Sequence, residues 1–185
     1  MKQLDTRLDG LVLLEPTVHG DARGFLTETF RQDVLARHGV EVAFVQDNHS
    51  RSSRGTVRGM HFQTWPGQAK LVRCARGGIL DVVVDLRRGS PTFGEWEGVE
   101  LDDERQRQLF LPVGFAHGFC VLSEVADVVY KLSSYYDPAT ENGIAYDDPD
   151  VGIAWPELEL LVSDRDADAP RLADIAEQLP FAWRA

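Results

Sequence analysis

The sequence predicts a mainly β fold of the jelly-roll type, with short helices at its periphery. Short apolar runs bounded by Gly, Pro or Asp recur along the 185 residues, which is typical of sandwiches and barrels. Turn signals separate these runs, and the helical patterns between them are short. Because a jelly roll leaves sheet edges open, we expect covering elements or a partner chain to protect those edges.

Strands are expected where apolar and β-branched residues lie between turn signals. The paired glycines Gly77 and Gly78 stand between two such runs, so we expect them to connect a hairpin. The stretch from Leu86 to Pro91 is expected to form a loop. The predicted strands are Leu11–Leu14, Val40–Val45, Lys70–Ala75, Ile79–Leu86, Leu109–Leu111, Gly118–Leu122 and Val128–Leu132.

Two helices are predicted. The segment from Phe30 to His38 has apolar residues at helical spacing and is followed by Gly39, a common helix stop. The segment from Pro170 to Leu179 also places its apolar residues on one face. Both helices are short, so we expect them to cover the barrel from outside.

Length and composition favour one domain over residues 1–185. No apolar run approaches the roughly 20 residues of a membrane span, and the first residues lack the apolar core of a signal peptide. We therefore expect a soluble, cytoplasmic protein with no membrane partner. The two cysteines, Cys74 and Cys120, lie in apolar stretches and are expected to be buried free thiols.

The net charge of −11 argues against nucleic acid as a partner, since such domains usually carry a basic face. The charge is unevenly distributed, because eight Lys or Arg stand against two Asp between Arg51 and Arg88. A local basic region in an acidic protein suits a small anion such as a diphosphate. An ordinary solvated patch remains an equal alternative on charge alone.

His61 lies in a segment that otherwise resembles a strand. A period of two sets His61 and Gln63 on one face and Met60 and Phe62 on the other, so the polar pair is expected to face a cavity. Arg58 reaches the same cavity only if a bulge at the intervening glycine breaks the alternation. A single strand histidine is most often structural, so this segment needs support from elsewhere.

Support comes from a second histidine, His117, which lies between small residues and is flanked by Phe115 and Phe119. This pattern indicates a ring held in a packed wall that excludes water. A core histidine bonded to the backbone explains the pattern equally well. The sequence leaves both interpretations open.

A metal site is disfavoured. Small β-barrels often hold a metal through a His-x-His pair with a nearby carboxylate, and no His-x-His occurs here. His61 is followed by Phe62 and Gln63, and the next carboxylate is Asp81. No metal or organic cofactor is expected.

Several further motifs occur in an order that identifies a family resemblance. The motifs are Gly20 to Phe25, Phe44 to Ser50, Arg58 to Gln63, Lys70 to Cys74, Ser90 to Gly94, Pro112 to Phe119, Tyr130-Lys131 and Ser163 to Pro170. A single one of these motifs is a modest signal, whereas their common order and spacing are specific. With these motifs the chain resembles the dTDP-4-dehydrorhamnose 3,5-epimerases over nearly its whole length.

The resemblance implies a cupin-type, double-stranded jelly-roll barrel that works as a homodimer on a dTDP-linked 4-keto-6-deoxy sugar. It implies that His61 is the catalytic base and Asp166 its carboxylate partner. It implies that Tyr130 is the general acid and that Lys70 lies near the C4 oxygen of the sugar. The substrate-binding positions implied by the resemblance are Arg23, Glu28, Gln46, Asp47, Asn48, Arg58, His117, Glu141 and Arg165.

The chain departs from the family pattern near these positions. Met60 replaces the more usual leucine, Arg165 stands where lysine is common, and the loop from Thr64 to Ala69 is short. The first two departures are next to catalytic positions, so the resemblance implies the reaction class but does not fix which sugar is bound.

The implied reaction needs no cofactor, because a carbon next to a ketone loses its proton to a well-placed base. A cation then stabilises the enolate oxygen, and an acid on the opposite face returns a proton. The alternatives are a single-centre epimerase or ketoisomerase, a metal-dependent cupin enzyme, and a binder of sugar nucleotides without activity. Product stereochemistry, metal analysis and the presence of the catalytic residues separate these possibilities.

Overall fold

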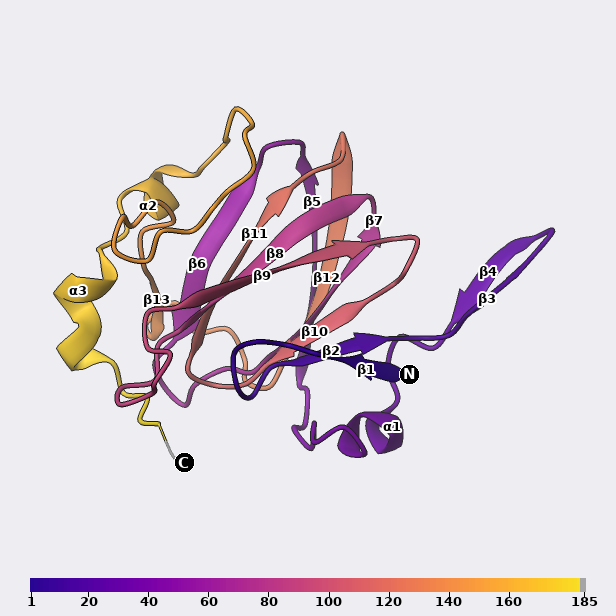
Figure 1. Ribbon diagram of the computed structural model, residues 1–185, viewed down its shortest axis with the longest axis horizontal. Helices are drawn as coiled ribbons and strands as arrows, with labels where there is room; N and C mark the ends of the chain where they lie inside the picture. Colours follow the sequence, from indigo (N-terminus) through magenta and orange to yellow (C-terminus); the bar gives the residue numbers. More distant parts are fainter. Residues whose placement is uncertain (184–185) are drawn as a thin grey trace.

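The computed structural model describes residues 1–183, which form two facing β-sheets and a separate hairpin (Figure 1). The strands are β1 (Lys2–Leu4), β2 (Val12–Glu15), β3 (Val18–Asp21), β4 (Gly24–Thr27), β5 (Gln46–Ser53), β6 (Val57–Gln63), β7 (Lys70–Arg76), β8 (Gly78–Asp85), β9 (Trp96–Asp102), β10 (Gln108–Leu111), β11 (Phe115–Val121), β12 (Val125–Leu132) and β13 (Glu141–Gly143).

The two sheets form the predicted jelly-roll barrel. The six-stranded sheet has the order β1-β2-β10-β7-β12-β5, and the five-stranded sheet has the order β13-β6-β11-β8-β9. Sequence neighbours such as β7 and β8 lie in different sheets, so the chain crosses repeatedly between the two layers. Crossings of this kind bring residues that are distant in the sequence to the same interior.

The main core lies between the sheets and includes Val72, Val83 and Phe119. A second cluster covers the outer face of the five-stranded sheet, where Met60 and Phe62 pack with residues of the C-terminal segment. Each fully buried side chain of this type contributes about 1.5–3 kcal/mol to folding. The outward burial of Met60 and Phe62 confirms the predicted alternation of β6.

The helices are peripheral, as predicted. Helix α1 (Gln32–Ala36) lies within the first predicted helix, and α3 (Leu172–Ile175) with the 3₁₀ turn η1 (Ala176–Gln178) lies within the second. A further short helix, α2 (Asp164–Ala167), was not expected. It lies near β6, on the side of the barrel that also carries β13 (Figure 1).

Two of the predicted elements are wrong. Residues Val40–Val45 form no strand, because Val40, Val42 and Phe44 instead cover the outer face of the six-stranded sheet beside α1. The strand follows at β5, whose side chains are all polar. Gly77 and Gly78 form no hairpin, because β7 and β8 belong to different sheets.

Gly77 instead makes the crossing between the sheets. Its φ is +76°, and a Cβ there would lie 2.3 Å from the carbonyl oxygen of Val125. Only glycine fits both the conformation and the close approach. The remaining strand predictions overlap observed strands, and both cysteines are buried free thiols, as predicted.

The hairpin β3–β4 projects away from the barrel (Figure 1). Its strand β4 carries the exposed apolar side chains of Phe25 and Leu26, which are 58% and 73% accessible. We refer to residues 18–27 as the arm. Among the described residues, none of the helices is long and apolar enough to span a membrane.

Candidate active site

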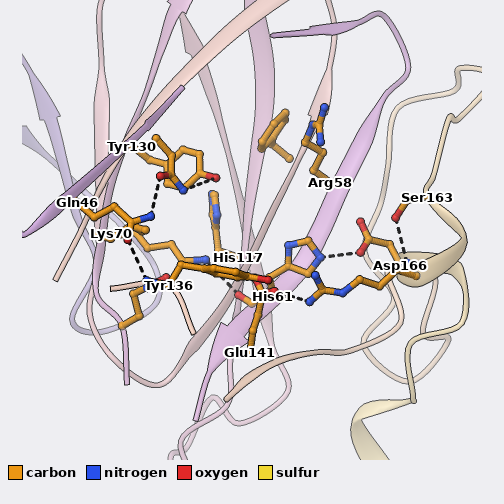
Figure 2. A pocket seen from close by; sticks show the side chains of 15 residues that line it. Gln46, Arg58, His61, Lys70, His117, Tyr130, Tyr136, Glu141, Ser163 and Asp166 are labelled. Atoms are coloured by element: carbon orange, nitrogen blue, oxygen red, sulfur yellow. Dashed lines mark hydrogen bonds and ion pairs between the residues drawn. The ribbon is translucent and has the colours of Figure 1, made fainter. Parts of the chain in front are cut away.

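A cavity of about 420 Å³ opens between the two sheets. Figure 2 shows side chains from both sheets and from the region of α2 pointing into it. The lining residues are Gln46, Asn48, Arg58, His61, Gln68, Lys70, His117, Phe119, Tyr130, Leu132, Tyr136, Glu141, Ser163, Arg165 and Asp166.

A bulge in β6 brings Arg58 and His61 into the same cavity. His61 pairs with His117 on β11, whereas Arg58 pairs with Phe119, so β6 advances three residues while β11 advances two. Gly59 is the extra residue, with a φ of +137° and no room for a Cβ, which would lie 2.5 Å from Gly118 Cα. The glycine bulge on which the prediction for Arg58 depended is therefore present.

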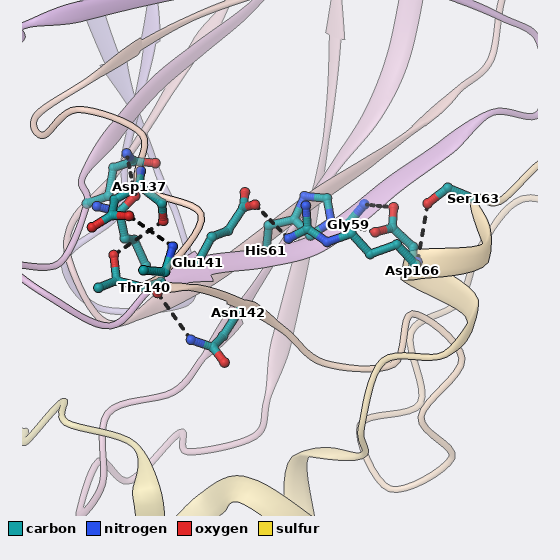
Figure 3. Close-up of polar contacts among 12 residues, drawn as sticks. Gly59, His61, Asp137, Thr140, Glu141, Asn142, Ser163 and Asp166 are labelled. Carbon is teal, nitrogen blue, oxygen red and sulfur yellow. Dashed lines mark hydrogen bonds and ion pairs between the residues drawn. The ribbon is translucent and has the colours of Figure 1, made fainter.

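His61 is held by Asp166. The Nε2 atom of His61 lies 2.6 Å from Oδ1 of Asp166, and the Gly59 N–H donates to Oδ2 at 3.2 Å. Burial acts to raise the pKa of Asp166, but the hydrogen bonds from His61, Gly59 and Ser163 hold it below its usual value. Asp166 is therefore an anion that fixes the orientation of the imidazole (Figure 3).

Helix α2 positions Asp166. Ser163 is its N-cap, and the Ser163 hydroxyl accepts a hydrogen bond from the Asp166 N–H at 3.2 Å. This cap satisfies a backbone donor at the start of the helix and orients the first turn. The single turn thus carries a carboxylate from the far end of the chain to His61 on β6.

Lys70 and His117 line the cavity, and Asp81 bonds His117 from behind; we call these three residues, which are nearly inaccessible to solvent, the cavity floor. Burial lowers the pKa of Lys70 to about 8, against the opposing effect of Glu141 and Asp81. Its Nζ atom lies 3.4 Å from the carbonyl oxygen of His61. The amine therefore lies beside β6.

His117 is bonded to Asp81, with Nε2 and Oδ2 separated by 2.9 Å. Burial lowers the pKa of His117, and the nearby charges of Lys70 and His61 act in the same direction against Asp81. The predicted packed wall around His117 is therefore observed. The alternative of a backbone-bonded core histidine is not, because its partner is a carboxylate.

Tyr130 enters from the other sheet. It lies on β12, and its hydroxyl accepts a hydrogen bond from the Asn48 side chain at 3.2 Å. Asn48 in turn accepts from Gln46 at 2.9 Å. His61 on β6 and Tyr130 on β12 thus face one cavity from opposite sheets, an arrangement suited to proton transfer at two faces of a substrate.

This combination of fold and site agrees with the comparison to known families. The model of the dTDP-4-dehydrorhamnose 3,5-epimerase family matches residues 5–174. The chain belongs to this family. The resemblance drawn from its motifs is thereby confirmed, together with the cupin-type jelly roll that it implied.

Individual epimerases of the family are similar over nearly their whole length. The dTDP-4-dehydrorhamnose 3,5-epimerase of Methanothermobacter thermautotrophicus is 51% identical over 166 residues, covering 88% of this chain and 90% of that protein. The dTDP-4-dehydrorhamnose 3-epimerase of Streptomyces niveus is 46% identical, covering 90% of this chain and 82% of that protein.

A solved structure is also very similar. The dTDP-6-deoxy-D-glucose-3,5-epimerase of Legionella pneumophila, crystallised with dTDP-4-keto-L-rhamnose, superposes with a TM-score of 0.96 at 44% identity. The match covers 100% of this chain and 99% of that chain. The described barrel therefore has the fold of an epimerase that holds a dTDP sugar.

The cavity gathers all but three of the residues predicted for the site. Asp47 lies on β5 between the inward-facing Gln46 and Asn48, so its side chain points outward and pairs with Lys131 at 2.9 Å. Arg23 and Glu28 lie on or next to the arm and do not line this cavity. Gln63 is buried but bonds the backbone of Tyr135 instead of lining the cavity.

Five lining residues escaped the sequence analysis, and they fall into two groups. Gln68 and Ser163 lie in loops, where periodicity gives no signal. Tyr136 also lies outside the strands. The remaining two, Phe119 and Leu132, lie in predicted strands whose apolar residues the sequence pattern assigns to the core.

Two of the lining residues, Glu141 and Arg165, form an ion pair. The Arg165 guanidinium pairs with the Glu141 carboxylate at 2.6 Å, linking the turn of α2 to β13. Hydrogen bonding to Glu141 raises the pKa of Arg165. Within residues 1–183, no cluster of three or more His, Cys, Asp or Glu side chains is arranged to hold a metal ion.

Proposed function

We propose that this protein inverts C3 and C5 of dTDP-4-dehydro-6-deoxyglucose to give dTDP-4-dehydro-L-rhamnose. The observation that carries the proposal is the opposition of His61 and Tyr130 across one cavity, with a buried lysine between the sheets. Removal of a proton next to the C4 ketone leaves a charge that spreads onto the ketone oxygen. Return of a proton to the other face then inverts the centre.

His61 is the proposed base. Asp166 occupies Nε2, so Nδ1 is the nitrogen available to the substrate. A carboxylate at Nε2 selects the tautomer with a free lone pair on Nδ1 and stabilises the imidazolium that forms after abstraction. Asp166 therefore acts on the proton transfer through His61.

Tyr130 is the proposed acid. Its phenol comes from the sheet opposite His61, which is the geometry that inversion requires. Asn48 donates a hydrogen bond to the phenol oxygen, which leaves the phenol proton free to point toward the substrate. The same donor stabilises the phenolate after the proton has left.

Lys70 is the proposed cation for the enolate oxygen. A buried ammonium acts in a low dielectric, where it stabilises developing negative charge more strongly than in water. The substrate ketone and this charge together perform the role that a metal performs in other barrel enzymes. The proposed chemistry therefore needs no cofactor.

The entrance of the cavity suits the dTDP group. Arg58 and Arg165 offer guanidinium forks for phosphate oxygens. Tyr136 is half exposed there and offers an aromatic face on which the base can stack. The basic segment noted in the sequence thus supplies Arg58 and Lys70 to one cavity.

We further propose a homodimer in which the arm completes the site of the partner. Arg23 and Glu28 lie on or beside the arm, and the apolar Phe25 and Leu26 are exposed on its strand β4. Exposed apolar groups on a projecting hairpin favour burial against a second copy. Two buried free thiols also agree with action in the reducing cytoplasm.

Inversion of a single centre is the second candidate, because the relative from Streptomyces niveus is named a 3-epimerase and is 46% identical. The test is nuclear magnetic resonance of the purified protein with dTDP-4-dehydro-6-deoxyglucose in deuterated water. Deuterium at both C3 and C5, with formation of the L-rhamno product, is expected. Label and inversion at one carbon would establish the second candidate instead.

A metal-dependent reaction is tested separately. Exhaustive treatment with a chelator is expected to leave turnover unchanged, since only protein groups and the substrate ketone take part. Loss of turnover that a divalent ion restores would contradict the proposed chemistry.

A further inference from the structure

Asp81 is a carboxylate with no accessible surface on the inner face of β8, where its strand neighbours are apolar core residues. Its Oδ2 bonds His117, and its Oδ1 has no hydrogen-bond partner among the described residues. Burying a carboxylate costs several kcal/mol unless it is paired. An apolar side chain would serve the packing better, so the position calls for another explanation.

The strand register connects Asp81 to the reacting groups. Asp81 pairs with Phe119 on β11, two residues from His117, and His117 pairs with His61 on β6. Asp81 is therefore placed behind His117, and His117 lines the cavity beside the proposed base. The charged or titratable groups that act on His117 are Asp81 from β8, Lys70 from β7 and His61 from β6.

The hydrogen bond determines which nitrogen of His117 carries a proton. An ionised carboxylate only accepts, so Nε2 must be the donor. Nδ1 has no partner among the described residues, and it is not among the side-chain atoms sealed from solvent. Burial lowers the pKa of His117, so at neutral pH the ring is uncharged and Nδ1 presents a lone pair.

We propose that Asp81 is a positioning residue that fixes the Nε2–H tautomer of His117, so that Nδ1 accepts a hydrogen bond from a hydroxyl of the bound sugar. This inference rests on the proposed function and refines it. A lone pair repels phosphate and ketone oxygens, whereas a sugar hydroxyl has a proton to donate. Because His117 faces His61 and Lys70, the acceptor lies at the reacting ring and not at the nucleotide.

The tautomer is tested directly on the free protein. Two-bond proton–nitrogen correlation spectra of protein with ¹⁵N-labelled histidine report the protonation of each ring nitrogen, and a His117→Gln spectrum assigns the signals. At pH 7 we expect Nε2 of His117 to be protonated and Nδ1 to be bare. A doubly protonated ring, or a proton on Nδ1, would overturn the proposal.

The functional consequence is tested with Asp81→Val, which suits a buried strand. Loss of one neutral hydrogen bond corresponds to about a tenfold fall in kcat/KM. The affinity for dTDP, which lacks the 4-keto-6-deoxy sugar, is expected to stay at the wild-type value in calorimetry. Equal losses for dTDP and for the sugar nucleotide would indicate a general structural defect and contradict the proposal.

A double variant tests whether Asp81 acts through His117. If it does, Asp81→Val combined with His117→Gln is expected to be no slower than His117→Gln. Losses that multiply would show an independent role and overturn the assignment. In Asp81→Asn, whose amide can accept or donate, activity is expected to follow the tautomer seen in the spectra.

Asp148→Asn is the matched control, because Asp148 is equally buried but accepts from the backbone of Leu172 and Asp150 away from the cavity. This variant is expected to lower thermal stability and leave kcat/KM unchanged. Failure of the proposed function would be recognised separately, since the wild-type protein would then form no inverted sugar while the His117 tautomer remained measurable.

Discussion

The two histidine–aspartate pairs of the barrel lie side by side but differ in their access to solvent. The side chain of His61 is 26% exposed and bonds Asp166 at 2.6 Å, whereas that of His117 is 6% exposed and bonds Asp81 at 2.9 Å. The same pair of residue types thus occurs in two different environments. The His61–Asp166 pair at the cavity wall is partly open to solvent, whereas burial of the His117–Asp81 pair on the floor lowers the pKa of His117 and favours its neutral ring.

The pairs also differ in how they are held. Asp81 belongs to β8, which pairs directly with the strand of His117, so the sheet itself fixes that contact. Asp166 comes from α2, a single turn of helix more than a hundred residues beyond His61 in the sequence. The wall pair therefore depends on the docking of a short peripheral segment. The predictions below test this contrast, beginning with the largest effect.

Replacing His61, the histidine at the cavity wall, should have the largest effect on kcat. His61→Asn removes the base, so we expect kcat to fall by at least about 10²–10⁴-fold, with no exchange of the C3 and C5 hydrogens in deuterated water. The floor variant His117→Gln should retain exchange, because its base is intact. Retained exchange in His61→Asn would remove His61 from its proposed role.

Replacing the proposed acid should separate hydrogen exchange from inversion, both of which need the base. In Tyr130→Phe the base can still abstract a proton, but no donor returns one to the opposite face. We expect deuterium incorporation to proceed measurably faster than formation of inverted product, as followed by nuclear magnetic resonance. If exchange is lost as completely as in His61→Asn, Tyr130 positions the substrate and does not donate.

Most of the barrel was predictable because its strands combine apolar runs with clear turn signals, as in β8 and β12. The polar strand β5 was not, because its inner face is a cavity lined by Gln46 and Asn48 and lacks an apolar stripe. Because β5 has no apolar stripe, the strand was assigned instead to the apolar segment Val40–Val45, whose residues cover the outer face of the six-stranded sheet. The polar residues that line the cavity thus replace the apolar alternation on which strand prediction relies.

The site shows a similar division. The alternation of β6 followed from residue order alone, and a bulge at Gly59 was identified only as the condition for Arg58 to reach the cavity. The pairing of His61 with Asp166 did not, because no local rule connects residues so far apart, and the family resemblance supplied it. Asp81 was missed altogether, since a single aspartate in an apolar strand carries no signal until its histidine partner is known.

The buried lysine between the pairs should set a limit on pH. Burial lowers the pKa of Lys70 to about 8, so its charge is present below that pH and is lost as the pH rises through it. We expect kcat/KM to fall on the basic side near pH 8 because the enolate loses its cation. A pH–rate profile of Lys70→Gln, slow at all pH values and lacking this limb, is the matched comparison.

Arg58 lies on the same bulged strand, β6, as His61. Its proposed role is to bind the diphosphate and not to transfer a proton, so the two roles are separable by mutation. Arg58→Met is expected to weaken binding of dTDP, because a guanidinium fork suits diphosphate oxygens. The rate of exchange at saturating substrate should change little. Unchanged affinity for dTDP in calorimetry would contradict the assignment of Arg58 to the diphosphate.

The smallest effect should come from the cap that holds α2. Ser163→Ala removes the side-chain acceptor for the Asp166 N–H, a loss that typically costs about 1 kcal/mol. If the wall pair depends on α2, kcat should fall severalfold while the His117 tautomer in ¹⁵N spectra is unchanged, because the sheet holds that pair.

Ser163→Thr should restore most of the activity, since threonine also caps helices. The matched control is Arg171→Ala, because Arg171 is the N-cap of α3 and makes no capping hydrogen bond with its side chain. It should leave kcat at the wild-type value. A Ser163→Ala variant with wild-type kcat would mean that the contacts of Asp166 with His61 and Gly59 orient the carboxylate without the cap, and that the wall pair is as independent of its helix as the floor pair is.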